Sequence, residues 1–576
     1  MELKGKSVSP GIAMGAALVY RPFAPCINED PLPEGGEAEA LRRYDEALER
    51  AGRELSELEA RLTADEPDKA AVFAAHRDIL CDPAMDEEIR NLVRTEHLSP
   101  DCAAARVYDM FRAVLSRSKN KLMRERASDL ADVKLRLLRC WAGEPERSLA
   151  SLAGPVVVVA EELFPSDTAG LDRKNVLGIV TETGGATSHT AIIARGYEIP
   201  AVLGVEGATE RIREGEFIIC DAERGLIFTE PCAGEIKDCE ARAAAFRERA
   251  ENERKFLRAV PVTRDGTRIE ILLNIGSGAG PELERAEFSD GSGLFRTEFL
   301  YQSGERLPDE AEQFEAYKKV LAAFGGKAVT LMTMDIGGDK QIPALELPKE
   351  ENPFLGLRGL RLSLEREAAF RAQLRAALRA SAFGKLKLML PMVGGLDELR
   401  DTKRILEEEE KAKLTAEGAA WDRDIKLGIM VEVPSVALIA EHAAREADFA
   451  SVGTNDLTQY LCAADRGNPL VRRYYQEYHP ALFRLLGELA RAFGAAGKEL
   501  GVCGELGGDA LAIPALIGLG IRRLSMGPAA LARAKKIVCG LDLAEAQKLA
   551  ARVCSLATND EVRAALESFA AEGKVV

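Results

Sequence analysis

From Pro261 onward the chain repeats one pattern: a short apolar run, a few polar residues and then a stretch with helical spacing. Eight such runs occur, at Ile269–Asn274, Gly293–Arg296, Ala328–Asp335, Leu386–Pro391, Ile425–Glu432, Phe449–Asn455, Leu500–Cys503 and Ile521–Ser525. Short apolar runs that alternate with helical patterns are typical of buried strands. An open doubly wound sheet is the competing arrangement. The count of eight favours a (β/α)8 barrel, in which functional residues follow the carboxyl ends of the strands.

Polar residues of complementary charge lie at five of these strand ends. The cationic ends carry Arg296 and, within segment 352–361, Arg358 and Arg361. The other ends carry Glu432, the pair Asn455-Asp456 with Arg466 shortly after it, and Cys503. Each residue alone has an ordinary alternative: most arginines are solvated, most cysteines pack in cores, and Asn455-Asp456 can cap the next helix. Five complementary strand ends together favour a binding site.

The residue types at these ends fit a phosphorylated carboxylic acid. Guanidinium groups make bidentate contacts to phosphate and carboxylate. Glu432 and Asp456, which follow different strands, suit Mg²⁺, because this ion takes few protein oxygens and fills its other positions with substrate and water. A thiol beside such a site, here Cys503, can deliver a proton.

A second motif, T-G-G-A-T-S-H-T-A-I-I-A-R at 183–195, surrounds His189, one of only five histidines in the chain. An apolar run at Leu177–Val180 predicts a strand before a Gly184-Gly185 turn, and Ala191–Ala194 can begin a helix. Three hydroxyl side chains flank the histidine: Thr187, Ser188 and Thr190. Free amides and the helix dipole favour an anion here, so the motif predicts a phosphoryl group held on imidazole. The alternative is a simple helix N-cap, Thr187 or Ser188, beside an exposed histidine.

The N-terminal half divides into a helical block and a β/α part. Residues 1–20 predict a short strand segment, and the pattern is helical from about Glu37 to Trp141. Within the block a leucine stripe (Leu41, Leu48, Leu55, Leu58, Leu62) precedes helical stretches at Ala70–Cys81, Met85–Thr95, Asp101–Arg117 and Glu125–Trp141. Val156–Val159 then begins a β/α pattern, so the block is predicted to be inserted into a small β/α domain that includes residues 1–20. Residues 233–258 predict a long charged connecting helix.

Composition excludes several classes of protein. Of the 576 residues 47% are apolar and 30% charged, which is ordinary for a soluble globular chain of about three domains. A net charge of −16 argues against general nucleic-acid binding. No apolar run is long enough for a signal peptide or a membrane span, so we expect a cytoplasmic protein without membrane association. The eleven cysteines lack CxxC or paired spacing and are expected to be reduced thiols.

Ten segments of the sequence match motifs of one superfamily. They are SPGIAMG (9–15), RERASDLADVKLRLL (124–138), GGATSHTAIIAR (184–195), GLFRTEFLY (293–301), MDIGGDK (334–340), ENPFLGLRGLR (351–361), EVPS (432–435), GTNDLTQY (453–460), DRGNP (465–469) and CGEL (503–506). In this order the chain resembles the Enzyme I family of the sugar phosphotransferase system, the phosphoenolpyruvate–protein phosphotransferases, along essentially its whole length. Pyruvate phosphate dikinase and phosphoenolpyruvate synthase share the histidine and barrel motifs. They need an ATP-grasp domain in front, for which the chain has no residues, so they are disfavoured.

The resemblance implies a division of the chain into four parts. Residues 1–20 and 145–230 would form a swivelling β/α phosphohistidine domain, and residues 21–144 an inserted helical domain that binds the carrier protein HPr. Residues 231–260 would be a linker helix. Residues 261–576 would form the (β/α)8 domain, a TIM-type barrel, which binds phosphoenolpyruvate and makes a homodimer.

The resemblance also implies roles for single residues. Phosphoenolpyruvate would bind with Mg²⁺ on Glu432 and Asp456. Its phosphate and carboxylate would meet Arg296, Arg358, Asn455, Asp456 and Arg466. His189 would attack phosphorus through Nε2 and later pass the phosphoryl group to HPr, with Thr168 orienting the histidine and Cys503 protonating the pyruvate enolate. Positioning and charge neutralisation of this kind are what phosphoryl transfer requires.

One position departs from the family pattern R-T-x-D-I-G-G-D-K: Met332 stands where the family has an arginine that grips the phosphate. Losing a charge-assisted contact costs about 1.5–3 kcal/mol, roughly ten- to a hundredfold in binding or rate. Arg361 and Lys340 are candidate replacements. The expectation is a weakened or retuned enzyme, and the alternative is a regulatory relative that binds without turnover.

Overall fold

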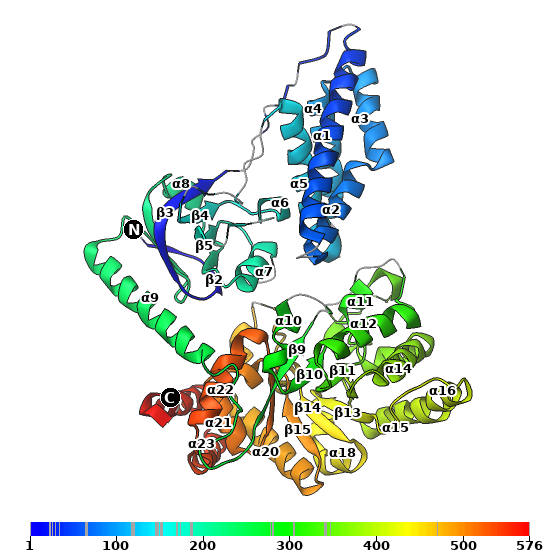
Figure 1. Cartoon of the computed structure of the whole chain (residues 1–576), viewed down its shortest axis with the longest axis vertical. Helices are drawn as coiled ribbons and strands as arrows, with labels where there is room; N and C mark the ends of the chain where they lie inside the picture. The colour runs from blue at the N-terminus through cyan, green and yellow to red at the C-terminus, as the bar shows by residue number, and fades with distance from the viewer. Residues whose placement is uncertain are drawn as a thin grey trace. The chain divides into compact units, whose positions relative to one another are not determined.

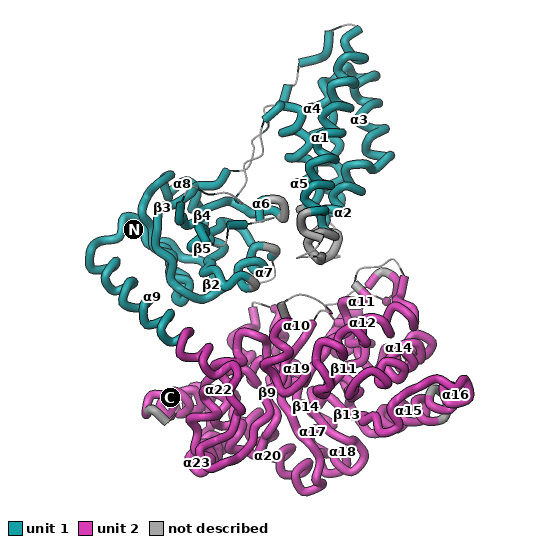
Figure 2. Tube along the Cα trace, viewed as in Figure 1, with its two compact units in different colours: residues 1–249 teal, residues 250–576 magenta. Residues whose placement is uncertain are grey.

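The computed structural model describes the chain except for residues 1, 22–24, 26, 29, 34, 64–66, 117–120, 145–148, 150, 151, 153, 169, 170, 173, 185–187, 277, 279, 280, 303–305, 339–341, 346, 349, 469, 575 and 576. It forms two compact units, Met1–Arg249 and Ala250–Val576, which Figure 2 colours separately. One helix, α9 (Ala233–Arg254), runs from the first unit into the second. The predicted connecting helix is therefore confirmed as far as Arg254.

A mixed β-sheet in the first unit combines strands from both sides of the helical block (Figure 1). Its strands are β1 (Glu2–Lys4), β2 (Lys6–Ser9), β3 (Ile12–Tyr20), β4 (Val156–Ala160), β5 (Val176–Thr181), β6 (Ala201–Leu203), β7 (Phe217–Asp221) and β8 (Leu226–Thr229). Their order across the sheet is β1-β8-β7-β3-β4-β5-β6-β2. Because β3 pairs in parallel with β4, residues 1–20 belong to the β/α part and the helical block is inserted, as predicted.

Strand β4 shows why its four valines form the middle of this sheet. Val157 and Val159 pack into one apolar cluster, whereas Val158 packs into another. Successive side chains of a strand point to opposite faces, so the valine run is buried on both sides. The short helices α6 (Pro165–Thr168), α7 (His189–Gly196) and α8 (Ala208–Arg211) connect the strands.

The inserted block is a bundle of helices. The helices are α1 (Glu37–Thr63), α2 (Pro67–Leu80), α3 (Pro83–Thr95), α4 (Pro100–Ser116) and α5 (Lys121–Ala142). Leu55 and Leu58 of the predicted stripe are buried in its core, and Leu41 and Leu48 pack against that core. The side chain of Leu62 lies outside the described residues.

In the described part of the second unit, parallel strands close into a barrel in the order β10-β11-β12-β13-β14-β15-β16-β9 (Figure 1). These strands are β9 (Glu270–Ile275), β10 (Gly291–Phe295), β11 (Ala328–Met332), β12 (Leu386–Leu390), β13 (Lys426–Val431), β14 (Phe449–Val452), β15 (Glu499–Val502) and β16 (Arg523–Met526). Each predicted run overlaps one strand. The barrel is confirmed, and the open sheet is excluded.

The predicted run Phe449–Asn455 was too long, because β14 ends at Val452 and a helix begins at Thr454. The helices of this unit are α10 (Pro281–Glu284), α11 (Phe299–Gln302), α12 (Glu310–Ala323), α13 (Leu360–Glu365), α14 (Glu367–Ser381), α15 (Leu396–Arg404), α16 (Ala412–Ala416), α17 (Pro434–Leu438), α18 (Ala440–Glu446), α19 (Thr454–Cys462), α20 (Pro480–Ala495), α21 (Ala512–Gly518), α22 (Leu531–Gly540), α23 (Leu543–Ser555) and α24 (Asn559–Phe569). A large apolar cluster between these helices and the strands forms the main core.

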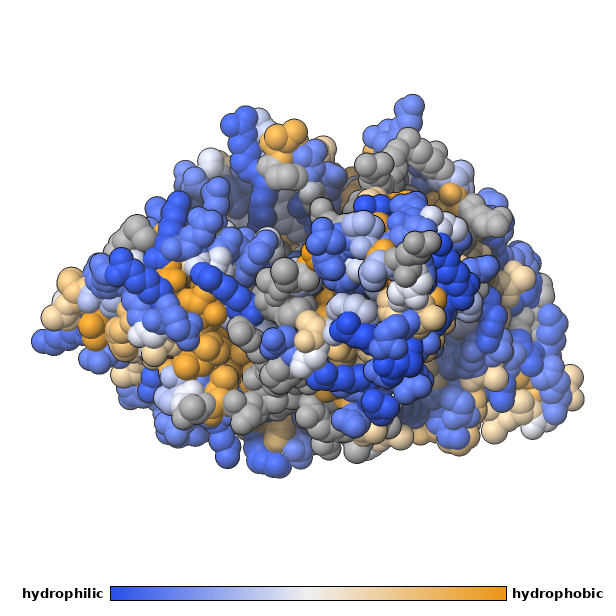
Figure 3. Space-filling view, turned by 90° about the horizontal axis from the view of Figure 1, so that it is seen from above, coloured by the Kyte–Doolittle hydropathy of each residue, from blue (hydrophilic) through white to orange (hydrophobic). Residues whose placement is uncertain are grey.

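Charged and polar residues cover most of the face seen in Figure 3, and apolar residues gather there in separate patches. None of the described helices combines the length and the apolar character that a membrane crossing requires. The ten described cysteines are free.

Candidate functional site

Arg358 is the centre of the polar network in the barrel unit. Its side chain is buried, with Nε 3.0 Å from Asp335 Oδ1 and Nη2 2.9 Å from Asp335 Oδ2. Its Nη1 donates to Asp456 Oδ1 at 2.9 Å and to the hydroxyl of Tyr460 at 3.4 Å. Burial disfavours the charged guanidinium, but Asp335 and Asp456 outweigh it and raise the pKa of Arg358. The arginine therefore stays charged and holds two carboxylates, from the ends of β11 and β14, in fixed positions.

Glu432 lies beside this pair at the end of β13. The side chain is 2% exposed, and its Oε1 accepts the backbone N–H of Met392 at 2.7 Å. Burial first, and then the charges of Asp456 and Asp335, raise the pKa of Glu432 well above its usual value. Met392 has a left-handed backbone (φ 57°), which is uncommon for a residue with a side chain. The contact to Glu432 is one restraint on this conformation.

Asn455 and Asp456 occupy the first turn of α19, but they do not cap it. The N-cap position is Gly453, without a side-chain hydrogen bond, so the alternative of a capping role is wrong. Instead, the side-chain oxygen of Asn455 accepts a hydrogen bond from the backbone N–H of Glu505 at 3.0 Å. The backbone carbonyl of Asn455 accepts one from the hydroxyl of Tyr475 at 3.2 Å. Asn455 thereby connects the ends of β14 and β15.

The two remaining predicted arginines are more open than Arg358. Arg466 places Nη2 3.6 Å from Asp456 Oδ2, and 36% of its side chain is exposed. Arg296 follows β10 and is exposed, and no described residue accepts a hydrogen bond from its guanidinium. Its positive charge is one of the influences that lower the pKa of the Cys503 thiol, against the larger effect of burial. Arg358 and Arg466 are thus linked through Asp456, which both of them contact.

An apolar cluster lies among the barrel strands near these polar residues. The cluster consists of Leu294, Met332, Met389, Met430, Phe449 and Cys503, contributed by neighbouring strands. Met332, at the position of the family arginine, is 3% exposed there. Burial raises the pKa of the Cys503 thiol to about 12, so the group stays protonated.

Of the two candidate replacements for the missing arginine, Arg361 makes its contacts elsewhere. Arg361 Nη1 donates to the carbonyls of Leu355 at 3.0 Å and Gly356 at 3.2 Å, so it braces its own loop. Lys340 lies outside the described residues.

The histidine motif lies at the start of α7 in the first unit. The helix begins at His189, and the Ser188 hydroxyl accepts the N–H of Ala191 at 3.3 Å, so Ser188 is the N-cap. Thr168 is buried, and its hydroxyl donates to the carbonyl of Phe164 at 3.4 Å. Gly185, Thr187 and the imidazole of His189 lie outside the described residues and side chains. The amides of a first helical turn have no partner within the helix, which is the feature the motif predicts for anion binding.

Sequence reasoning missed several residues that the structure places in these networks. In the barrel unit they are Asp335, Met392 and Tyr460, and in the first unit Tyr20 and Asp167. Asp335 could have been found, because it follows a predicted strand as Glu432 does. The Tyr20 hydroxyl donates to Asp167 at 2.5 Å, and burial raises the pKa of Asp167 to about 6. No local pattern indicates that pair, because it joins distant parts of the sequence.

Comparison with known families identifies the class of protein that this fold and site define. Residues 250–543 match the PEP-binding domain of PEP-utilising enzymes, residues 152–225 match their mobile domain, and residues 4–126 match their N-terminal domain. The barrel with its strand-end charges and the histidine-bearing sheet thus both fall within matched domains. The chain is a member of the phosphoenolpyruvate-utilising enzymes.

Comparison with individual proteins identifies the family within this class to which the chain belongs. The chain is 41% identical to a phosphoenolpyruvate-protein phosphotransferase of Bacillus subtilis (strain 168) over 565 residues, 97% of this chain and 98% of the relative. It is 40% identical to a protein of that name from Listeria innocua, over 99% of this chain and 100% of the relative. A Haemophilus influenzae protein of the same name is 38% identical over the full length of both chains. The chain belongs to the phosphoenolpyruvate-protein phosphotransferase family.

Proposed function

We propose that this protein transfers the phosphoryl group of phosphoenolpyruvate to His189 and then to the histidine of the carrier protein HPr, releasing pyruvate. Family membership over nearly the whole chain is the observation that carries the proposal. The same observation does not favour a regulatory relative without turnover. The first step breaks the bond between phosphorus and the enol oxygen and forms one between phosphorus and imidazole Nε2.

In this proposal the arginines receive the substrate anion. Arg296 and Arg466 offer exposed guanidinium groups, whereas most donors of Arg358 already bind Asp335 and Asp456. Asn455 adds an amide at the same strand end. The Cys503 thiol, kept protonated by burial, delivers its proton to the carbon of the enolate, which leaves pyruvate.

The proposed cofactor is Mg²⁺, held by Glu432 and Asp456. The carboxylates of Asp335 and Asp456 both raise the pKa of the buried Glu432, so the three negative groups act on one another. Arg358 is the buried cation beside them. Because the carboxylates outnumber this cation, they favour a further positive ion. Among the described residues no three His, Cys, Asp or Glu side chains are arranged to hold a metal by themselves. Two carboxylates with the other positions left to substrate and water fit Mg²⁺. The ion would neutralise charge on the phosphate and the enolate.

Further parts of the proposal concern the other domains. We assign residues 1–20 and 145–230 to the phosphohistidine domain, in which Thr168 orients His189, and residues 21–144 to HPr binding. Residues 231–260 act as the linker, and residues 261–576 bind phosphoenolpyruvate and form a homodimer. The proposed location is the cytoplasm, where phosphoenolpyruvate and the carrier are available.

The decisive experiment is incubation of the full chain with ³²P-labelled phosphoenolpyruvate and Mg²⁺. We expect acid-labile label on the protein, and its transfer to HPr when that carrier is added. His189→Ala should remove the label, whereas Ser188→Ala, which removes only the N-cap hydrogen bond, should retain it. Absence of label on the unmodified chain at millimolar substrate would contradict the proposal. Sizing of the same sample with and without ligand tests the homodimer.

A further inference from the structure

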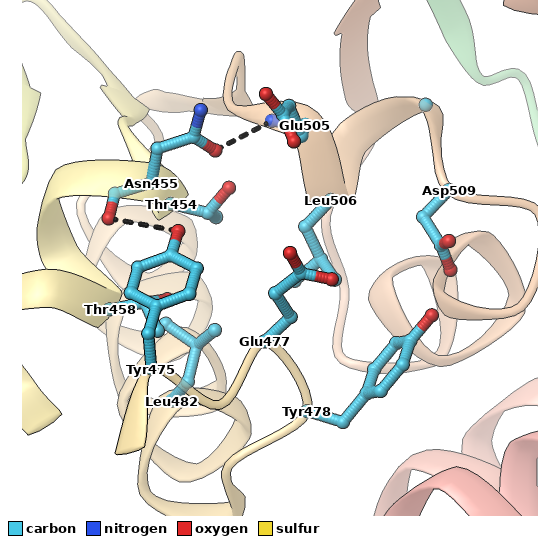
Figure 4. A pocket seen from close by; sticks show the side chains of 11 residues that line it. Thr454, Asn455, Thr458, Tyr475, Glu477, Tyr478, Leu482, Glu505, Leu506 and Asp509 are labelled. Carbon is cyan, nitrogen blue, oxygen red and sulfur yellow. Dashed lines mark hydrogen bonds between the residues drawn. The ribbon is translucent and has the colours of Figure 1, made fainter. Parts of the chain in front are cut away.

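A cavity of about 300 Å³ lies in the barrel unit beside the strand ends (Figure 4). Its walls come from the start of α19, from residues 475–478 before α20, and from residues 505–509 after β15. This volume is at the lower end of the range for small-molecule sites. None of the carboxylates that line it was assigned a role in the proposed reaction.

The cavity is strongly acidic. Glu477, Glu505 and Asp509 line it, together with the phenol rings of Tyr475 and Tyr478. In Figure 4 the carboxylate of Glu477 points into the middle of the space, between the two tyrosines. Partial removal from water, and then the negative charges of Glu505 and Asp509, raise the pKa of Glu477. Arg563 and Arg472 oppose this rise with smaller effects, so the nearby cations do not balance the carboxylates.

A buried hydroxyl provides an independent sign of a ligand. Thr454 is 2% exposed and lines the cavity, and its Oγ1 has no hydrogen-bond partner among the described residues. Figure 4 shows this hydroxyl on the cavity side of its backbone. A buried hydroxyl without a partner is costly, so a donor from a bound molecule would stabilise this position.

We propose that this cavity binds a small organic cation that carries primary ammonium groups. An ammonium offers three N–H donors, which suit the carboxylates of Glu477 and Glu505 and the oxygen of Thr454. The ring of Tyr475 provides an aromatic face for the same charge, whereas the ring of Tyr478 already lies against the guanidinium of Arg563. A metal ion fits less well, because the carboxylates surround a space and, among the described residues, do not converge as a metal site requires.

Occupation of the cavity should affect the neighbouring reaction site, a consequence that rests on the proposed function. Asn455 lines the cavity and also belongs to the predicted substrate site. The hydroxyl of Tyr475 donates to the backbone carbonyl of Asn455. The side-chain oxygen of Asn455 accepts a hydrogen bond from the backbone N–H of Glu505. A cation that binds Glu505 and packs on Tyr475 would therefore act on Asn455 from both sides. We expect a change in the KM for phosphoenolpyruvate.

Calorimetric titration of the full chain with 1,4-diaminobutane, at constant ionic strength, tests the site without requiring turnover. We expect saturable binding, at least about tenfold weaker in Glu477→Gln because one charge-assisted contact is lost. Thr454→Val should also weaken it. The matched control is Glu488→Gln, which removes the same charge from an exposed position on α20 and should leave binding unchanged. Neutral 1,4-butanediol should not bind.

Several results would overturn the inference. One is absence of diamine binding at millimolar concentration, and another is equal affinity in the parent chain and Glu477→Gln. Displacement of the diamine by millimolar Mg²⁺ at matched ionic strength would identify the cavity as a metal site instead. In turnover assays a diamine-dependent shift in KM should disappear in Glu477→Gln. If the proposed activity itself is absent, the calorimetric result still decides whether the cavity takes a cation.

Discussion

Restoring an arginine at position 332 is the sharpest test of how the barrel mouth holds phosphate. Met332 is 3% exposed in the apolar cluster with Met389 and Met430, and its carbonyl accepts the hydroxyl of Thr297 at 3.1 Å. The stem of an arginine can follow the same path between the methionines, because long side chains place their charge beyond an apolar stem. The guanidinium would then reach the polar layer around Arg358.

Two opposing free energies set the expected result of Met332→Arg. A new charge-assisted contact to the substrate phosphate contributes about 1.5–3 kcal/mol, roughly a ten- to hundredfold gain in kcat/KM. The larger side chain overpacks the cluster, at a cost of about 1–3 kcal/mol in the free energy of unfolding. The gain in kcat/KM appears only when substrate is bound, whereas the loss of folding stability is present in the free protein. The variant should therefore be less stable and more active.

Steady-state pyruvate release in the presence of HPr, coupled to lactate dehydrogenase, measures the gain over a range of phosphoenolpyruvate concentrations. Urea unfolding followed by the fluorescence of Trp421, the tryptophan of the barrel unit, measures the cost. Met332→Leu is the matched control, because it keeps the site apolar and should change neither quantity by more than about 1.5 kcal/mol. A stable Met332→Arg variant with unchanged kcat/KM would refute the reasoning, since the arginine would then be present without reaching the phosphate.

Other substitutions separate structural from substrate-binding groups. Arg358→Met removes the cation shared by Asp335 and Asp456, and the barrel unit should lose about 3–5 kcal/mol of stability in urea unfolding. Arg296→Ala should leave stability unchanged and raise the KM for phosphoenolpyruvate about ten- to a hundredfold in the pyruvate assay. Asp167 binds its proton more tightly when folded (pKa about 6) than when unfolded (3.8), so stability should fall by up to about 3 kcal/mol as pH rises from 4 to 6. Asp167→Asn should flatten this dependence in denaturation followed by circular dichroism; an unchanged slope would contradict the assignment.

The architecture was predictable because the strands and helices of each domain have recognisable patterns of apolar residues in the sequence. The barrel strands are short apolar runs between helices, and the count of eight runs distinguishes a barrel from an open sheet. The insertion of the helical block was predictable because Val156–Val159 resumes a β/α pattern after it. The boundary at β14 was missed because Gly453 ends the strand while the sequence continues with polar residues that suit a strand end equally well.

The site was predictable as a set of residues but not as a network. Polar residues that follow the strands of a parallel barrel lie at the same end of it. The sequence therefore predicts that Arg358, Glu432 and Asp456 lie close together. It gives no sign of which carboxylate a given arginine binds. Asp335 takes two of the donors of Arg358, and the Met392 amide binds Glu432. Both contacts depend on loop conformations that residue type alone does not determine.

Counting donors distinguishes the roles of the two key arginines. A guanidinium has five N–H groups. In Arg358 two of them bind Asp335, one binds Asp456 and one is directed at Tyr460, so at most one remains for a substrate oxygen. Arg296 is exposed, and its guanidinium donates to no described residue, so the five donors of that group are available. The two residues look equivalent in the sequence, since each lies within a motif of the barrel. Under the proposed function, we therefore expect Arg358 to position the two carboxylates and Arg296 to bind the phosphate of the substrate.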